Sequence, residues 1–173
     1  VTLAINHLLG GTDVRIYHAT NLGIHLLAAL VLYALLRRLL GTAGDIAAFL
    51  GALLWTVHPL QTESVTYTAQ RAESLVGLFL LCTLYALVRA ADPADAVRRQ
   101  RWQMATVTAC LLGVFCKEVM VVAPVLALLL DRTFLAGSIG GAWRARRGLY
   151  LALLATWLPL AWLVAGSAGR GGT

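Results

Sequence analysis

Residues 17–36 read YHATNLGIHLLAALVLYALL and are followed at once by Arg37 and Arg38. A helix needs about 20 mostly apolar residues to cross a bilayer, and basic residues are typical of the position where such a helix ends. The rest of the chain has the same character, because 60% of its 173 residues are hydrophobic and only 13% are charged. Soluble domains usually carry about 25% charged residues. The composition therefore predicts an integral membrane protein of the all-α class.

Five further apolar segments follow the first one. They are predicted as helices, and Asp45 is expected to cap the second helix of the chain through its side chain. The chain starts at Val1 and reads as a piece of a longer protein. We predict a polytopic membrane helical bundle of about six transmembrane or part-spanning helices. The segments are 46–57, 74–88, 102–116, 119–130 and 149–165, within a transmembrane helical domain 17–166 that lies between an outer-side juxtamembrane segment 1–16 and a truncated outer-side loop 167–173.

The basic residues indicate how this bundle is oriented. Six spans place alternate loops on opposite sides, and the side richer in arginine is expected to be cytoplasmic. Ten basic residues fall on one side and four on the other. The ten are Arg37, Arg38, Arg89, Arg98, Arg99, Arg101, Arg132, Arg144, Arg146 and Arg147; the four are Arg15, Arg71, Lys117 and Arg170. Three polar clusters, around residues 17–25, 58–71 and 117–118, then face outward together.

Four of the spans are shorter than a bilayer. Residues 46–57 form about 18 Å of helix at 1.5 Å per residue, and residues 119–130 are similar, whereas the hydrocarbon core is about 30 Å thick. Irregular backbone at membrane depth must line a wet cavity or be buried in protein. We therefore expect a recessed cavity that opens to the outer side; the alternative is that the helices continue into the polar stretches.

The net charge of +6 and the pI of about 9.8 raise the question of nucleic-acid binding. The arginines, however, lie between apolar spans, where membrane topology explains them, so no nucleic-acid partner is predicted. The three cysteines have neither disulfide nor zinc spacing. The sequence also contains no phosphate-binding loop of the nucleotide type, and this favours a lipid-borne ligand over a soluble sugar nucleotide.

The first polar cluster lies on one helix face. His18, Asn21 and His25 are three and four residues apart, so their side chains stack on the same side. Such a face is unlikely to contact lipid. It could form hydrogen bonds between helices, contact a ligand or a lipid phosphate, or bind a metal ion. No carboxylate shares the face, and no metal site is predicted there.

The second cluster runs from His58 to Arg71 and holds two candidate reactive groups. Glu63 could act as a base, ligate a divalent cation or form an ion pair with Arg71. A guanidinium offers planar, bidentate donors, so Arg71 suits a phosphate. The alternative is a buried Glu63–Arg71 pair that only holds the loop together. The presence of a divalent metal is left open.

The third cluster is Lys117-Glu118, which interrupts an apolar stretch. The two side chains could neutralise one another in a salt bridge. Alternatively, Lys117 contacts a phosphate while Glu118 orients a neighbouring group. Asp131 and Arg132 lie at the other end of the following span, where anchoring at the membrane boundary explains them.

These residues resemble the type-C glycosyltransferases (GT-C), most closely the membrane half of the transmembrane O-mannosyltransferases with tetratricopeptide repeats. The likeness covers nearly the whole chain, with Glu73 at a position where relatives often have Asp. The matching stretches are Tyr17-His18, Asn21, His25, His58-Pro59, Thr62-Glu63, Val65, Arg71-Ala72-Glu73 and Lys117-Glu118.

The resemblance implies a partial GT-C fold and transfer of a sugar, of the hexosyl or mannosyl type, from a polyprenyl-phosphate carrier to a protein or glycan acceptor. It places the catalytic base, an acidic residue, upstream of this chain, in a loop on the periplasmic or lumenal side, so the fragment alone is expected to be inactive. Within the chain, Glu63 and His58 are the catalytic candidates. The residues expected at the lipid phosphate and substrate are Arg71, Lys117, Glu118, His18, Asn21 and His25.

Two other functions fit the pattern of polar groups in a membrane chain. A transporter or flippase-like protein would use them as a relay, and a non-catalytic membrane anchor would use them for helix packing. Only one of the 14 basic residues is a lysine. This bias suggests a GC-rich bacterial source and hence a multi-pass protein of the bacterial inner membrane.

Overall fold

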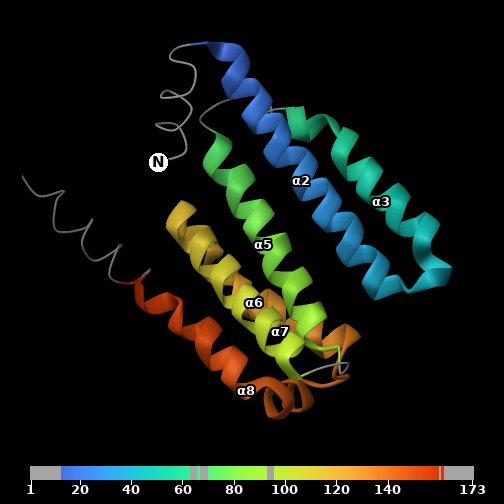
Figure 1. The fold of residues 1–173 in the computed structure, drawn as a ribbon, viewed down its shortest axis with the longest axis vertical. Helices are drawn as coiled ribbons and strands as arrows, with labels where there is room; N and C mark the ends of the chain where they lie inside the picture. The colour runs from blue at the N-terminus through green and yellow to red at the C-terminus, as the bar shows by residue number, and fades with distance from the viewer. Residues whose placement is uncertain (1–12, 63–65, 67–69, 93–95, 160, 162–173) are drawn as a thin grey trace, which may run out of the picture. The chain divides into compact units, whose positions relative to one another are not determined.

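The computed structural model describes residues 13–62, 66, 70–92, 96–159 and 161, and six α-helices account for most of them (Figure 1). Within these residues all regular structure is helical, which confirms the all-α class. The chain divides into two compact units, Val1–Leu78 and Phe79–Thr173, here called the first and second units. Helix α5 (Arg71–Ala90) begins in the first unit and continues into the second.

The first unit is built on an antiparallel helical hairpin. Helix α2 (Val14–Leu40) is joined through a 3₁₀ turn, η1 (Thr42–Gly44), to α3 (Asp45–Val57), and a second 3₁₀ turn, η2 (Pro59–Gln61), follows. The side chain of Asp13 caps α2 by accepting the N–H of Arg15 at 2.9 Å. Gly41 ends α2 with a φ of 67°, a left-handed conformation that glycine adopts without a steric penalty. This tight connection places α3 directly alongside α2.

Asp45 does not cap α3, so that prediction is wrong. The helix begins at Asp45 itself, after Gly44, and no side chain caps it. The carboxylate of Asp45 instead accepts two hydrogen bonds from Arg37, at 2.8 and 3.1 Å, across the turn. An oppositely charged side chain within reach competes with the helix's own N–H groups for a carboxylate. The ion pair therefore closes the hairpin at its turn.

Small side chains let the two helices of the hairpin approach closely. Ala28 of α2 and Ala48 and Ala52 of α3 are buried, together with Leu35. Small residues at a contact are a common means of packing helices in membranes. Large apolar side chains such as Leu30 and Leu54 remain exposed, as expected where lipid is the solvent.

The second unit contains three more helices. Helix α6 (Ala96–Cys116) is followed by a 3₁₀ segment, η4 (Glu118–Val122), then by α7 (Ala123–Phe134) and α8 (Ile139–Ala155). Only the later part of the predicted helix 119–130 is α-helical. Its first residues belong to the 3₁₀ segment η4. Helix α8 begins at Ile139 rather than at residue 149, and it includes a kink with non-helical backbone at Arg146.

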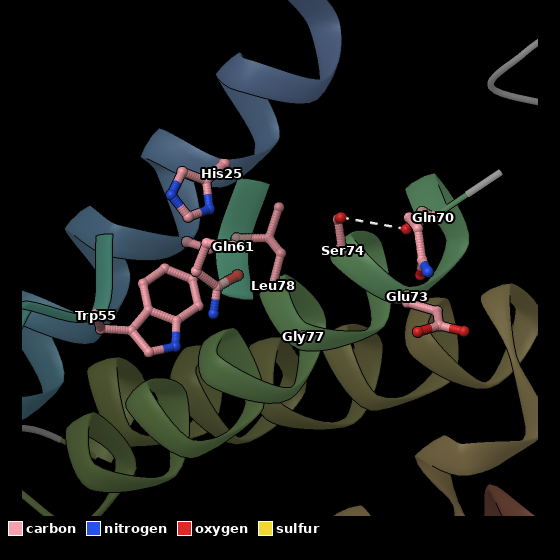
Figure 2. A pocket seen from close by; sticks show the side chains of 9 residues that line it. His25, Trp55, Gln61, Gln70, Glu73, Ser74, Gly77 and Leu78 are labelled. Atoms are coloured by element: carbon pink, nitrogen blue, oxygen red, sulfur yellow. Dashed lines mark hydrogen bonds between the residues drawn. The ribbon is translucent and has the colours of Figure 1, made fainter. Parts of the chain in front are cut away.

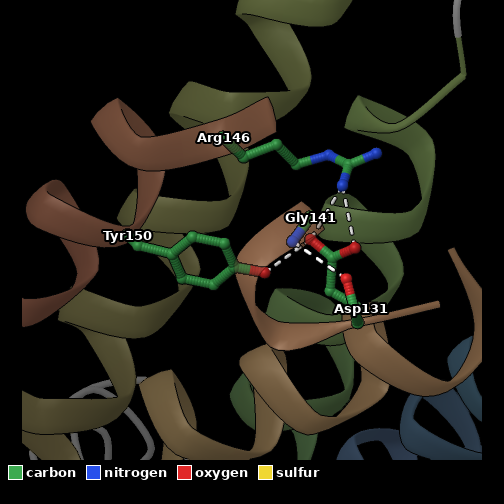
Figure 3. Close-up of polar contacts among 5 residues, drawn as sticks. Asp131, Gly141, Arg146 and Tyr150 are labelled. Atoms are coloured by element: carbon green, nitrogen blue, oxygen red, sulfur yellow. Dashed lines mark hydrogen bonds and ion pairs between the residues drawn. The ribbon is translucent and has the colours of Figure 1, made fainter. Parts of the chain in front are cut away.

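A buried polar cluster joins α7 to α8 (Figure 3). Nη1 of Arg146 donates to both carboxylate oxygens of Asp131 at 2.8 Å, and the hydroxyl of Tyr150 donates to Oδ2 of Asp131 at 2.6 Å. Asp131 is fully buried. The predicted role of Asp131 as an anchor at the membrane boundary therefore left out its main contacts. Its carboxylate is enclosed by side chains of the next helix.

Two described helices are long and apolar enough to cross a membrane, namely α2 and α5. The shorter apolar segment Thr42–Val57 has fewer residues than a full crossing needs. The count of six spans remains a prediction for the other helices.

Candidate functional site

A buried arginine connects the start of α5 to α2. Nε of Arg71 donates to the side-chain oxygen of Asn21 at 2.7 Å, and Nη2 donates to the backbone oxygen of Tyr17 at 3.2 Å. The guanidinium carbon also lies 5.6 Å from the centre of the Tyr17 ring. Arg71 is 2% exposed and Asn21 is fully buried. These contacts hold the guanidinium in one orientation against α2.

The third nitrogen of this guanidinium, Nη1, is buried and has no hydrogen-bond partner among the residues that the structure describes. Nor does any carboxylate in the described ranges form an ion pair with Arg71. A buried donor without a partner costs about 1–3 kcal/mol, and a buried charge without a counter-charge costs more. The arrangement is what a binding site for an anion requires: two nitrogens fix the group, and the third remains available.

The helical face predicted from residues 18, 21 and 25 exists, and its members differ in burial. Asn21 and His25 are buried, whereas His18 is half-buried. Only Asn21 of the three is seen to contact Arg71 directly. Of the three side chains on this face of α2, the amide of Asn21 therefore binds the guanidinium of Arg71.

His25 packs against α3. Its ring stacks on Trp55, with centroids 5.1 Å apart and planes inclined by 22°. Nε2 of His25 lies 3.0 Å from the backbone oxygen of Thr56. A carbonyl oxygen only accepts, so Nε2 must carry a proton and donate to it. The hydrogen bond therefore ties α2 to α3, which agrees with the interhelical interpretation of this residue.

A cavity of about 200 Å³ lies beside His25 in the first unit (Figure 2). Five of its nine lining residues are polar, most of its lining surface is apolar, and α2, α3, η2 and α5 all contribute. The hydroxyl of Ser74 donates to the backbone oxygen of Gln70 at 3.2 Å. A small cavity with this mixture of polar and aromatic groups suits a hydroxylated ligand. The lining consists of His25, Ala28, Trp55, Gln61, Gln70, Glu73, Ser74, Gly77 and Leu78.

Arg71 and this cavity are neighbours on the same two helices. Gln70 precedes Arg71, and Ser74 lies one turn further along α5. On α2, His25 lies about one turn, or 5–6 Å, beyond Asn21. Arg71 and its partner Asn21 thus lie within about one helical turn of cavity-lining residues on α5 and α2, respectively.

Two candidates of the second cluster are less informative. His58 is exposed, and its Nδ1 accepts the N–H of Leu60 at 3.2 Å, so it caps η2. Glu63 lies outside the described residues. Its predicted pairing with Arg71 and its catalytic role remain predictions.

Lys117 and Glu118 interrupt the α-helical structure between α6 and α7, as predicted. Both residues belong to the second unit. Lys117 has extended backbone between α6 and η4 and is half-buried, while Glu118 is exposed. Their convergence with Arg71 in one cavity stays a prediction. In the described part of the chain, no group of three or more His, Cys, Asp or Glu side chains could hold a metal ion.

Sequence reasoning missed the cavity residues Trp55 and Ser74, and it did not single out Gln61 and Gln70 within the predicted cluster from His58 to Arg71. In the sequence, Trp55 looks like any other apolar residue of a span. Its contact with His25 becomes visible only when α3 packs against α2. Gln70 could have been found, because it is a polar residue adjacent to Arg71 at the start of an apolar helix. Gln61 likewise lies in a predicted polar stretch, whereas Ser74 has no such signal in the sequence.

Comparison with known proteins identifies the family. The model of the family described as dolichyl-phosphate-mannose-protein mannosyltransferase matches residues 2–164. No solved structure matches the chain.

Several animal proteins are similar to this chain. Human protein O-mannosyl-transferase TMTC3 is 28% identical over 120 residues, which is 68% of this chain and 12% of that protein. Drosophila melanogaster Tmtc3 is 30% identical over 139 residues, 68% of this chain and 15% of that protein. Human TMTC1 is 34% identical over 93 residues, 53% of this chain and 10% of that protein.

The chain thus aligns with less than a sixth of the length of these relatives. The resemblance to the transmembrane O-mannosyltransferases is confirmed as distant, partial homology, whereas these animal relatives give no support to a bacterial source. Tetratricopeptide repeats are not among the described elements. Because the family model covers most of its length, the chain belongs to the dolichyl-phosphate-mannose-protein mannosyltransferase family.

Proposed function

We propose that this chain supplies the phosphate-binding part of the donor site in a membrane protein O-mannosyltransferase. The donor would be a dolichyl-type polyprenyl-phosphate mannose, and the acceptor a protein hydroxyl on the lumenal or periplasmic side. The observation that carries the proposal is the buried guanidinium of Arg71, whose Nη1 has no hydrogen-bond partner in the described part of the chain.

Arg71 has the chemistry that this role demands. Asn21 and Tyr17 fix two of its nitrogens, so little side-chain entropy remains to be lost when an anion binds. Guanidinium–phosphate hydrogen bonds are short and charge-assisted. In a site shielded from water such a donor stabilises the charge that grows on a departing phosphate. Arg71 would therefore act both in binding the donor and in the transition state.

The transfer itself balances as a direct displacement at the anomeric carbon. The acceptor oxygen forms a bond to that carbon, the bond from the carbon to the phosphate oxygen breaks, and the lipid phosphate leaves with the electron pair. A carboxylate takes the acceptor's proton, and by the family resemblance this base lies upstream of the chain. Glu63 and His58 are retained as candidates for positioning groups in the same reaction.

The polar cavity beside His25 supports the proposal as a place for the sugar. It lies one helical turn from Arg71, and a sugar is joined to its carrier phosphate directly. Lys117, Glu118 and His18 are proposed to complete the surroundings of the lipid phosphate. The family match favours this reading over a transporter or an inert anchor, since both lack a sugar-transfer reaction.

The test is transfer of mannose from dolichyl phosphate mannose to an acceptor peptide by the intact protein that contains this chain. Arg71→Gln should lower the turnover on the order of 100-fold or more, because one preorganised donor at the developing charge is lost. Arg89→Gln is the matched control: Arg89 lies on the same helix, but its guanidinium packs 4.5 Å from the Trp102 ring. Normal turnover of the Arg71 variant would remove Arg71 from the donor site.

A further inference from the structure

A groove of about 400 Å³ runs between α6 and α8 in the second unit, outside the site described above. Its walls are mainly apolar, with Met104 and Val107 on α6 and Leu149 and Ala152 on α8. Met104 is 63% exposed, so no other part of the described chain covers it. Along α6 the groove reaches from residue 100 to residue 108, about 12 Å at 1.5 Å per residue. It is therefore an elongated apolar trough.

One end of the trough carries two amide side chains. Gln100 and Gln103 line it at the first turns of α6, whereas the only polar lining residue at the other end is the hydroxyl-bearing Thr108. An amide at the end of an apolar trough can donate hydrogen bonds to ester or phosphate oxygens of a ligand. A ligand that fills the whole groove should therefore be apolar along most of its length and polar at one end.

Arginines border the same end of the groove. Arg99 and Arg101 flank Gln100 on α6, and Arg147 precedes the lining residue Gly148 on α8; Arg98 lies one residue further back. All four are exposed, and none forms an ion pair within the described ranges of the chain. Clusters of four or more arginines at the end of a membrane helix attract anionic lipids. The charge of the ligand's polar end should therefore be negative.

We propose that this groove binds one anionic phospholipid, with an acyl chain along Met104, Val107, Leu149 and Ala152 and the headgroup phosphate among Arg99, Arg101 and Arg147. The site is separate from the proposed donor site, and it requires no sugar carrier. A bound lipid would bridge α6 and α8 and fill the space between them. The protein would thus depend on the anionic lipid content of its membrane.

Gly148 allows the groove to be blocked without disturbing the fold. A Cβ atom added at Gly148 meets no other atom within 4 Å, so the space beside it is open. Gly148→Leu should place its side chain in the groove. Gly140 is the matched control, because it is in the same helix, has equally open surroundings and does not line the groove. Both substitutions replace a helical glycine by a residue that favours helix.

The test is lipid retention by the intact protein, measured by native mass spectrometry after purification from vesicles of phosphatidylcholine with or without phosphatidylglycerol. The wild type and Gly140→Leu should retain one phosphatidylglycerol, and Gly148→Leu should lose it. Arg101→Gln with Arg147→Gln should weaken retention on the order of tenfold. The control pair Arg15→Gln with Arg38→Gln removes the same charge from α2 and should retain the lipid.

Three results would overturn the proposal. Equal retention by Gly148→Leu and Gly140→Leu would show that the groove is not the site. Equal retention of phosphatidylcholine and phosphatidylglycerol by the wild type would show that the arginines do not select an anionic headgroup. Displacement of the bound mass by free phosphate alone would show that the ligand is a phosphate ion and not a lipid.

Discussion

The guanidinium of Arg71 and the amide of Asn21, which are 50 positions apart in the chain, meet through a hydrogen bond of 2.7 Å. Both side chains are buried, and the partner of the cation is a neutral group. A carboxylate in place of the amide would satisfy the charge permanently. The neutral partner instead orients Arg71 and leaves its charge without a counter-charge among the described residues, as the proposed donor site requires.

This pairing predicts the effect of Asn21→Asp in the intact protein. The new carboxylate would neutralise Arg71, so the free energy of unfolding should be unchanged or higher while donor binding weakens. Loss of one hydrogen bond to a charged group corresponds to about 1.5–3 kcal/mol, which is on the order of 10- to 100-fold in the KM for dolichyl phosphate mannose. Ala19→Asp adds the same charge to an exposed position of α2 and should leave the KM unchanged. An unchanged KM for Asn21→Asp would argue against phosphate binding by Arg71.

The Asp131–Arg146 ion pair should contribute much more to the free energy of unfolding than the Arg37–Asp45 ion pair. Asp131→Asn leaves Arg146, whose side chain is only 14% exposed, without its counter-charge and should lower the free energy of unfolding by about 3 kcal/mol. Asp45→Asn breaks the Arg37 pair, whose side chains are 48% and 43% exposed, and should cost about 0.5 kcal/mol. Unfolding of the intact protein in mixed micelles at increasing denaturant measures both. Equal effects would mean that the burial of Asp131 does not strengthen its pairing.

The contact of Gly113 with Met120 predicts a steric effect at the junction of α6 and η4. A Cβ atom at Gly113 would lie 2.8 Å from the sulfur of Met120, which is only 1% exposed. Gly113→Ala should therefore destabilise by about 1–3 kcal/mol.

Gly77→Ala is the control for this variant, because a Cβ atom there meets nothing within 4 Å, and helix propensity should make it neutral or stabilising. In a protein that already carries Met120→Ala, the further change Gly113→Ala should no longer lower the free energy of unfolding. If it still does, the close approach of these two residues is not the source of the strain.

The predicted orientation of the helices can be tested by cysteine labelling. In a variant without Cys82, Cys110 and Cys116, single cysteines replace Leu60, Glu118 or Arg101, all of which are exposed. A membrane-impermeant maleimide should label positions 60 and 118 from the outer side, and position 101 only after permeabilisation. Labelling of positions 60 and 118 from opposite sides would exclude a shared cavity.

Some features of the site could be read from the sequence because they depend on local periodicity. The three-and-four spacing on α2 predicted the face that holds Asn21, and an arginine opening an apolar helix marked Arg71 as unusual. The break at Lys117 was also predicted, since a charged dipeptide between apolar runs rarely continues a membrane helix.

Other features could not be predicted because they depend on contacts between distant segments. The bonds from Arg146 and Tyr150 to Asp131 form only when α8 folds back on α7. Hydropathy also misplaced the start of α8. It reports where apolar residues begin, whereas arginine and alanine favour helix irrespective of the membrane boundary. The helix can therefore start at Ile139, well before its apolar part.

The short connection between α2 and α3 has a consequence for biosynthesis. Its contacts, from Arg37–Asp45 at the turn to His25–Thr56 at the open end, join residues at most 31 positions apart. Local contacts of this kind form early, whereas distant ones must wait for loop closure. We expect the hairpin to assemble before the start of α5 docks onto it, with Asn21 already facing inward. The anion site would then be completed last, when the start of α5 docks onto a preformed surface.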